Sequence, residues 1–277
     1  MTMTKSPVDS GVNVEALFGS REMPLQITID HHHNGPMGSG HGGVAAGRFA
    51  ALVDAQASSV RLHAPIPLST PMRWLTADGT VHVYADDQRI STVRPLSAPL
   101  RVGQFGRLAQ ADVAAAEIAW LDDRCGVHIA PTCFACGPDR TEVGLNLRPG
   151  PVVETSLFAT AWRPEMDHDV PPWLVWAALD CPTGFPALAV VGPTNAAVTG
   201  ELAVEILEAV PGGGDYQLIS RCTGVDGRKV TAEAAVVDER GRALAVATAT
   251  WIAVPLQLLR PDLAPAGSAP SDAAALG

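Results

Sequence analysis

One acidic residue stands inside an otherwise apolar run and is the clearest candidate for chemistry in this sequence. The run is WLVWAALDCPTG, residues 173–184, and its acidic residue is Asp180. A helix places four residues of this run on one face, at the spacing i, i+3, i+4 and i+7: Trp173, Trp176, Ala177 and Asp180. A carboxylate on a core-facing stripe must be paired, hydrogen-bonded or held with a raised pKa, and such groups concentrate at catalytic sites.

A structural role is the alternative for Asp180. Pro182 follows two residues later, and a proline cannot donate to the carbonyl four residues back, so the pattern predicts that the helix ends there. Asp180 would then cap the helix or form a pair at its end. The residues of this run alone leave both roles open.

A glycine-rich segment is the second candidate. His41-Gly42-Gly43 follows the turn-rich residues 34–40 and opens VAAGRFAALVDAQ, a run of strong helix formers. Small residues at a helix start let a carbonyl or phosphate approach the unpaired first-turn N–H groups, where the helix dipole favours negative charge. The alternative is an ordinary flexible turn before a helix.

An internal repeat connects the two candidates. Residues 41–56 and 171–186 are both helix-length apolar runs led in by a turn, at a constant offset of 130. Four β-like stretches follow each run: 59–66, 70–77, 79–85 and 89–96, and then 198–207, 215–224, 229–238 and 242–254. One helix followed by about four antiparallel strands, twice over, predicts two α+β units that each wrap a sheet around a helix.

The two halves of the repeat are complementary rather than equivalent. Asp180 of the second run aligns with Ala50 of the first, and His41-Gly42-Gly43 aligns with residues 171–173, Pro-Pro-Trp. If the two units pack as a pseudo-dimer, the glycine-led helix end of one half can face the carboxylate of the other. This arrangement gives one complete site in the chain.

Three motifs resemble the hotdog fold in its double form, and within it the PaaI-like acyl-CoA thioesterases and their tandem relatives. They are GSGHGGVAAG at 38–47, the helix WLVWAALD that ends in Asp180, and CFACGPDRTEVGLNL at 133–147. The last is similar to the family's Cys-x-x-Cys-Gly segment, and with the repeat the resemblance covers roughly residues 23–255. It implies an α+β fold, a tandem hotdog with two antiparallel sheets each wrapped around a central helix.

The resemblance also implies a thioester hydrolase acting on acyl-CoA or an acyl carrier. In that family the backbone N–H groups of the HGG turn polarise the thioester carbonyl, and a helix carboxylate of the partner subunit attacks it or activates a water. Carried over, Gly42 and Gly43 are the donors and Asp180 is the nucleophile or general base. We expect these residues to bind substrate: Asn34, His41, Trp173, Trp176 and Thr183. No cofactor is expected.

This sequence departs from the single-chain family because it lacks a second HGG and a first aspartate, which predicts one active site per chain. The expected organisation has five parts: a flexible N-terminal segment at 1–22, a first hotdog unit at 23–97, a connecting segment with a helix at 98–124, a second unit at 125–255, and a disordered tail at 256–277. The helix at 111–121 is expected to pack across the seam between the units.

Composition restricts the partners. A net charge of −10 and a pI near 5.2 argue against nucleic acid and anionic membranes as partners. A CoA diphosphate needs a local basic patch, for which the sequence offers Arg48, Arg61, Arg73 and Arg148. The N-terminus has no secretory h-region and no run approaches the ~18 apolar residues of a membrane span, so a cytoplasmic location is expected. Homo-oligomers are also compatible with such a fold.

Cysteines and histidines raise the question of a metal. The sequence has five cysteines, an odd number that fits free thiols in a reducing compartment. Cys133-x-x-Cys136 has zinc spacing, but structural zinc usually needs four ligands and the sequence has no second such pair, so no metal is expected. The triplet at 31–33, His-His-His, is read as solvated or site-rim histidines, because successive strand residues point to opposite faces. Cys181 is read as a small buried apolar side chain with no activating histidine in sequence range.

Two other functions stay open. Hotdog dehydratases and hydratases pair a histidine with an acidic residue, and His168 lies twelve residues before Asp180. The sequence lacks the Gly-Asp-x-Asn-Pro pattern of the hydratase motif. A noncatalytic acyl or aromatic ligand-binding module is the third hypothesis.

Overall fold

The computed structural model describes residues 26–36, 38–121 and 127–263. Its helices are η1 (His31–His33), α2 (Gly42–Ala50), α3 (Gln110–Ile118), α4 (Pro172–Val191), η3 (Leu256–Leu258) and η4 (Pro261–Leu263). Its strands are β1 (Gln26–Ile27), β2 (Ala57–Leu62), β3 (Met72–Ala77), β4 (Thr80–Ala85), β5 (Gln88–Pro95), β6 (Gly150–Pro151), β7 (Phe158–Trp162), β8 (Asn195–Ile206), β9 (Tyr216–Asp226), β10 (Lys229–Val237) and β11 (Ala243–Pro255). The N-terminal segment expected at 1–22 and residues 264–277 of the expected tail lie outside the described residues.

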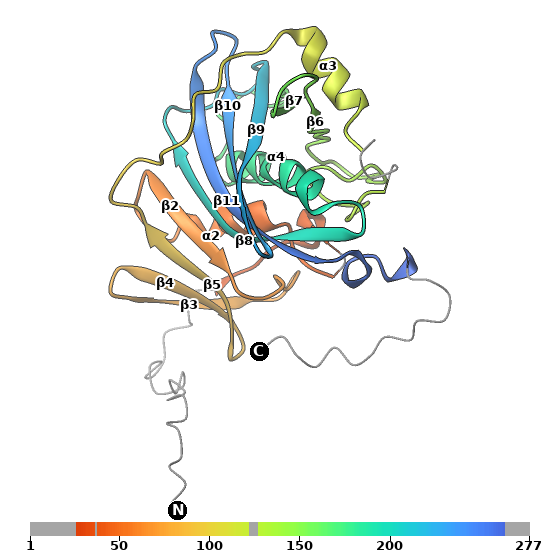
Figure 1. The fold of residues 1–277 in the computed structure, drawn as a ribbon. Helices are drawn as coiled ribbons and strands as arrows, with labels where there is room; N and C mark the ends of the chain where they lie inside the picture. The colour runs from red at the N-terminus through yellow and green to blue at the C-terminus, as the bar shows by residue number, and fades with distance from the viewer. Residues whose placement is uncertain (1–25, 37, 122–126, 264–277) are drawn as a thin grey trace, which may run out of the picture.

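The strands form one continuous antiparallel sheet rather than two separate sheets. Its order is β1-β3-β4-β5-β2-β8-β11-β10-β9-β7-β6, and Figure 1 shows it curving around α4 with α2 alongside. The halves join where Ala57–Arg61 of β2 pairs with Glu201–Glu205 of β8. The expectation of two sheets is therefore corrected, because pairing the two inner edge strands satisfies backbone groups that separate sheets would leave unpaired.

The strand order reads the same from each side of the β2–β8 seam. Outward from the seam the first half runs β2, β5, β4, β3, β1, and the second runs β8, β11, β10, β9, β7, followed by the short β6. The helices begin at Gly42 and Pro172, so the offset of 130 taken from the sequence is the offset of the two helix starts. The four strands expected after each helix are present, with ends shifted by a few residues.

Helix α4 does not end at Pro182, contrary to the sequence expectation. It continues through Pro182 and Pro186 to Val191, and every residue from Leu174 to Leu188 is buried. Pro186 cannot donate to the carbonyl of Pro182, and the hydroxyl of Ser220 on β9 donates to that carbonyl instead, at 2.6 Å. Burial of the helix and the hydrogen bond from Ser220 thus allow the helix to continue beyond Pro182 and Pro186.

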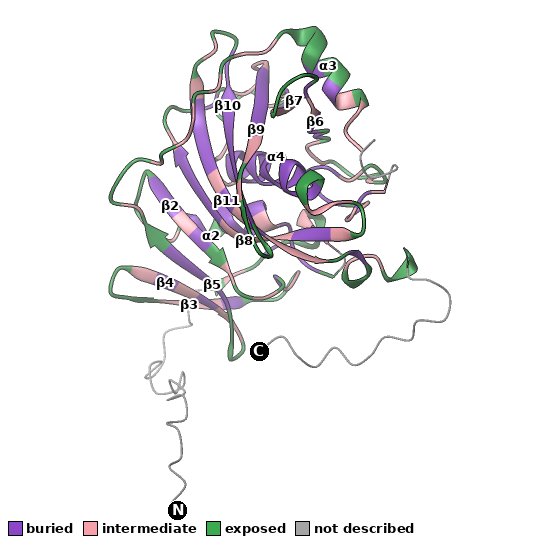
Figure 2. Cartoon of the chain, viewed as in Figure 1, coloured by how far each residue is buried: buried purple, intermediate pink, exposed green. Residues whose placement is uncertain are grey.

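By length and hydropathy alone, α4 would be long enough to cross a membrane, and the expectation that no run approaches such a length is corrected here. Most of the helix is buried inside the protein, as Figure 2 shows, and the core helix of a folded domain meets the same criteria.

Helix α3 lies at the outer end of the second half. Val113 and Ala116 pack with Val152 and Ala159 at strands β6 and β7. The expectation that this helix crosses the seam is wrong, because the strands it covers form one end of the sheet, whereas the β2–β8 pair lies in its middle.

Candidate functional site

The two central helices touch through glycines. A Cβ built on Gly43 would lie 2.8 Å from the Trp176 carbonyl oxygen and 2.9 Å from the Cα of Ala177. A Cβ on Gly47 would lie 2.6 Å from the Cα of Trp173. These are the residues expected on one face of α4, and that face packs against α2. Gly43 and Gly47 therefore let two backbones approach to distances that any side chain would prevent.

Asp180 lies at this crossing, at the first turn of α2. One carboxylate oxygen, Oδ2, accepts from the Gly43 N–H at 2.8 Å, and the other, Oδ1, accepts from the Thr199 hydroxyl of β8 at 3.0 Å. The residue is 2% exposed. Both oxygens accept hydrogen bonds, as an ionised carboxylate does, and the positive end of the α2 dipole favours that charge.

The pKa of Asp180 is raised, because burial penalises the charged form. The nearby His41 and the hydrogen bonds from Thr199 and Gly43 act in the opposite direction. The carboxylate is thus held by donors in a site that would otherwise favour the neutral acid. A raised carboxyl pKa with specific partners is the pattern of a functional site.

His41 is the N-cap of α2 and is buried beside Asp180. Its Nδ1 accepts from the Val44 N–H at 3.2 Å, so the neutral ring carries its proton on Nε2. That nitrogen lies 3.3 Å from the Cys181 sulfur and 3.6 Å from the Oδ2 of Asp180. Burial lowers the pKa of His41, but Cys133 and Asp180 outweigh it and leave the pKa raised.

The structure uses the HGG turn differently from the sequence expectation. The Gly43 N–H is occupied by Asp180, whereas the Gly42 N–H donates to no residue that the structure describes. The preceding loop is pinned by main-chain bonds, including one from the His41 N–H to the His33 carbonyl at 2.7 Å. Thr199 was not singled out by sequence reasoning, because its contact depends on the register of β8.

The residues expected to bind substrate lie around the crossing of α2 and α4, and their surroundings differ from one residue to the next. Asn34 donates to the Thr132 carbonyl at 2.9 Å and accepts from Arg140, which ties the first loop to the Cys-x-x-Cys loop. The Thr183 hydroxyl is occupied in the core, where it donates to the Asp180 carbonyl and accepts from the Trp251 indole.

The two tryptophans of α4 also differ. Trp176 is buried against α2. Trp173 is half-buried, and it packs edge-on against the His33 ring while the Arg48 guanidinium lies 4.5 Å from its ring centre. Of these two rings, Trp173 is therefore the one at the rim of the site.

The four arginines considered for a CoA diphosphate belong to separate elements. Arg48 is on α2, Arg61 on β2, Arg73 on β3, and Arg148 in the loop before β6. Arg73 donates to the Asp86 carbonyl at 2.9 Å.

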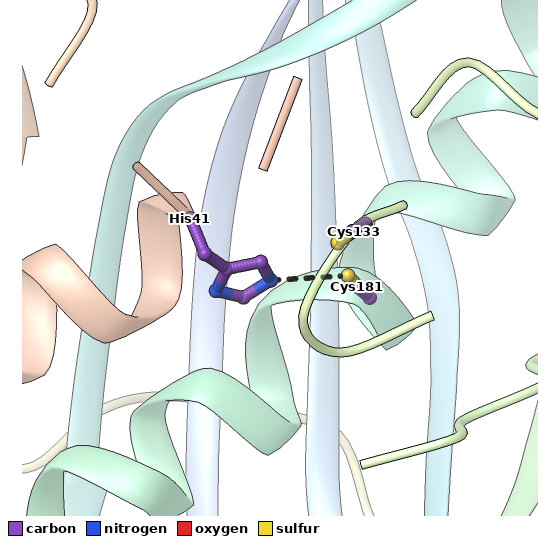
Figure 3. A group of neighbouring side chains, drawn as sticks. All are labelled: His41, Cys133 and Cys181. Carbon is purple, nitrogen blue, oxygen red and sulfur yellow. Dashed lines mark hydrogen bonds between the residues drawn. The ribbon is translucent and has the colours of Figure 1, made fainter. Parts of the chain in front are cut away.

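Cysteine side chains gather next to Asp180, and this convergence was missed by sequence reasoning. The sulfurs of Cys136 and Cys181 are 3.1 Å apart, and Figure 3 shows the His41 ring directed at Cys181 with Cys133 beside it. Cys181 thus has a histidine partner 140 residues away in the chain, which corrects the interpretation based on sequence range. The four cysteines that the structure describes are free thiols.

The three clustered thiols differ in pKa. The Cys133 pKa is held well below its usual range, because the thiols of Cys136 and Cys181 hydrogen-bond to it. The pKa values of Cys136 and Cys181 are raised well above theirs, because their protons take part in these bonds with Cys133 and because both are buried.

The other histidines considered from the sequence, at 31–33 and 168, lie on the exposed surface or in partly buried positions. Residues His31–His33 form the 3₁₀ turn η1 rather than a strand, which brings the ligand atoms of Asp30, His31 and His32 within 4.8 Å of one another, all on the exposed surface. His168 is exposed and bonds to Asp167 at 2.9 Å. The histidine that lies against Asp180 is His41.

Solved structures share this fold. A proposed thioesterase from Novosphingobium aromaticivorans superposes with a TM-score of 0.55 at 13% identity, over 82% of this chain and 94% of that chain. A hot dog fold protein from Alicyclobacillus acidocaldarius gives 0.54 at 18% identity, over 83% and 91%. The tesB protein of Mycobacterium avium subspecies paratuberculosis gives 0.50 at 14% identity, over 77% and 84%. The sequence matches no protein-family model and no curated protein.

These likenesses establish the fold: the chain is an α+β protein with a hotdog fold, and it resembles the double-hotdog thioesterases over most of its length.

Proposed function

We propose that this chain is a tandem hotdog thioester hydrolase that acts on an acyl-CoA or acyl-carrier thioester where α2 meets α4. One observation carries the proposal: the buried Asp180 carboxylate lies against the first turn of α2, held by the Gly43 N–H and the Thr199 hydroxyl. The names of two fold relatives, a tesB protein and a proposed thioesterase, support the reaction class. The free thiols of the described cysteines fit the proposed cytoplasmic location.

In the proposed reaction a water adds to the thioester carbonyl carbon while Asp180 takes one of its protons. The Gly42 N–H donates to the carbonyl oxygen as it becomes negative, and such a donor is worth on the order of 3 kcal/mol. The carbon–sulfur bond then breaks, the thiolate receives the proton from Asp180, and a carboxylic acid is left. Direct attack by the carboxylate is the alternative route within the same class.

Access to the carboxylate is a requirement of this proposal. Asp180 is 2% exposed, so a thioester reaches it only after a local opening of the residues that cover it. Such opening steps are common in enzymes and often limit turnover.

The test is thiol release from short, medium, long and aromatic acyl-CoA by wild type and Asp180→Asn. The amide can keep its oxygen on the Gly43 N–H and donate its NH₂ to the Thr199 oxygen, so folding should survive. We expect hydrolysis to fall by at least ~100-fold. Asp87→Asn is the matched control, because it makes the same change on an exposed turn.

Retention of wild-type hydrolysis by a folded Asp180→Asn protein refutes the assignment. Absence of turnover with every acyl thioester favours the noncatalytic acyl-binding alternative instead.

A second candidate function is a dehydratase or hydratase acting on an acyl thioester. The observation that favours it is the His41–Asp180 pair, with Nε2 and Oδ2 3.6 Å apart, since a histidine and a carboxylate can divide proton removal and proton return. His41, and not His168, is the proton-transfer group in this version. Enoyl formation from a 3-hydroxyacyl thioester, without thiol release, distinguishes it from hydrolysis.

A further inference from the structure

Four side chains that can bind a metal ion, three thiols and one imidazole, converge where three distant parts of the chain meet. His41 comes from the start of α2, Cys133 and Cys136 from the loop before β6, and Cys181 from the middle of α4. The ligand atoms of His41, Cys133 and Cys181 all lie within 4.8 Å of one another, and the Cys136 sulfur is 3.1 Å from that of Cys181. All four residues are buried.

The loop that carries Cys133 and Cys136 is shaped to present both sulfurs to one point. The Gly137 N–H donates to the Cys133 carbonyl at 2.9 Å, which turns the chain back on itself directly after Cys136. A Cβ at Gly137 would lie 2.4 Å from the Cys133 nitrogen, so only glycine allows this turn. Two cysteines separated by two residues in a tight turn are the usual half of a structural zinc site.

Neighbouring bonds hold this loop in place over α2 and α4. The Phe134 N–H donates to the Asn34 carbonyl at 2.8 Å, and the Leu147 N–H donates to the Ala135 carbonyl at 2.8 Å. The cysteine positions are therefore fixed from both sides of the turn.

Ordinary core packing explains this cluster poorly. Buried free cysteines are common, but each then packs among apolar side chains. Here the sulfurs of Cys136 and Cys181 are 3.1 Å apart, and the Cys181 sulfur lies 3.3 Å from the Nε2 of His41. That nitrogen is in turn 3.6 Å from the Asp180 carboxylate.

We propose that Cys133, Cys136, Cys181 and His41 form a four-coordinate site for zinc, which fastens the Cys-x-x-Cys loop to α2 and α4. Three sulfurs and one imidazole nitrogen are a common ligand set of closed, structural zinc sites. The role is structural, since four protein ligands leave no position for water or substrate.

The donor distances fit with a small expansion. Tetrahedral zinc with bonds of about 2.3 Å to sulfur places sulfurs about 3.8 Å apart. The Cys136–Cys181 separation of 3.1 Å must therefore widen by roughly 0.7 Å. Ligation through Nε2 of His41 moves the ring proton to Nδ1, which breaks the bond that Nδ1 accepts from Val44. Each thiol that ligates loses its proton on binding.

The test begins with the full chain purified without chelator, in which elemental analysis should find one zinc per chain. Replacement by Co²⁺ should give the intense thiolate-to-cobalt and d–d absorption of a tetrahedral cobalt–thiolate site. Cys133→Ser and Cys181→Ser should each lower the zinc content at least tenfold, whereas Cys222→Ser, on β9 outside the cluster, should keep it.

Two readouts keep the proposal testable if the cysteine variants unfold. Chelation of zinc from wild type should lower its melting temperature and change amide exchange at Val44. His41→Ala should shift the cobalt bands without abolishing them, because three thiolates remain. Folded, fully reduced wild type that binds neither zinc nor cobalt overturns the proposal, as does a Cys136–Cys181 disulfide found in the native protein by mass spectrometry.

Discussion

Helices α2 and α4 are the equivalent elements of the two halves, yet they contribute different groups to the candidate site. α2 has 9 residues and supplies backbone: glycines at the contact and N–H groups at its first turn. α4 has 20 residues, is buried along most of its length, and supplies the side chain of Asp180. One half of the chain thus supplies backbone donors and the other supplies the carboxylate.

The contacts between these helices are reciprocal. At the offset of 130, Gly43 aligns with Trp173 and Gly47 with Ala177; Gly43 touches Ala177 and Gly47 touches Trp173. Such paired exchange is the signature of a two-fold interface, here within one chain. The counterpart of the Gly43–Asp180 bond would join Trp173 and Ala50, and Ala50 has no carboxylate. The symmetry of the fold therefore permits two such bonds, while the side chains provide one.

The largest effect should come from giving α2 a side chain at the contact. Gly43→Ala or Gly47→Ala would force a methyl group against the backbone of α4 at distances below 3.0 Å. Overpacking of this kind costs about 1–3 kcal/mol or more, which lowers the melting temperature by roughly 2–12 °C. Thermal unfolding of both variants measures it.

Gly106→Ala is the control for that experiment, because a Cβ there meets nothing within 4 Å. If Gly43→Ala and Gly47→Ala melt with Gly106→Ala, the close crossing of the two helices is wrong.

The next effect concerns how the second half holds its carboxylate. Thr199→Val keeps the shape of the side chain and removes the hydroxyl that donates to Oδ1 of Asp180. We expect kcat for thioester hydrolysis to fall about tenfold with little change in KM. The reason is that poor positioning of the base weakens proton transfer in the transition state more than it weakens substrate binding. Thr199→Ser should recover most of the rate, and a serine variant as slow as valine would contradict the positioning role.

Much of this fold follows from local patterns. The helix starts at 42 and 172, the strands after them, and the α4 face formed by Trp173, Trp176, Ala177 and Asp180 all depend on short-range periodicity, which the sequence displays directly. The end of α4 does not, because the Ser220 hydroxyl that serves the Pro182 carbonyl comes from another strand. The single sheet depends on edge pairing between β2 and β8, which no local pattern encodes.

The residues of the candidate site also fall into those that local sequence patterns reveal and those that they do not. Asp180 and the HGG turn could be found because an acidic residue in an apolar run and glycines at a helix start are visible locally. The convergence of His41 with Cys181 could not, because these residues are 140 positions apart and meet only in the folded chain. Thr199 could not, because its contact with Asp180, 19 positions away, depends on how β8 packs against α4. Spacing therefore revealed the Cys133-x-x-Cys136 pair but not that His41 and Cys181 lie beside it.

A smaller loss of stability should follow from removing the hydrogen bond that Ser220 donates to the Pro182 carbonyl of α4. Ser220→Ala leaves the Pro182 carbonyl without its donor and should cost about 1 kcal/mol. In a Pro186→Ala background the new N–H of residue 186 can serve that carbonyl, so the same serine change should cost less. A double-mutant cycle by chemical denaturation measures the difference. Equal costs in the two backgrounds would show that Ser220 does not replace the missing helical bond.

The smallest effect should come from the exposed edge of the helix contact, where Arg48 of α2 lies 4.5 Å from the Trp173 ring centre. Arg48→Gln removes the cation and should cost about 0.5 kcal/mol, with the exposed Arg94→Gln as control. If Arg48 serves only the helix contact, the KM for an acyl-CoA and for the same acyl group on N-acetylcysteamine should change by the same factor. The small thiol carries no phosphate, so a rise in KM confined to the CoA ester would assign Arg48 to phosphate binding. That result would give the donor half a side-chain role as well, and the division between a backbone-supplying and a side-chain-supplying half would no longer hold.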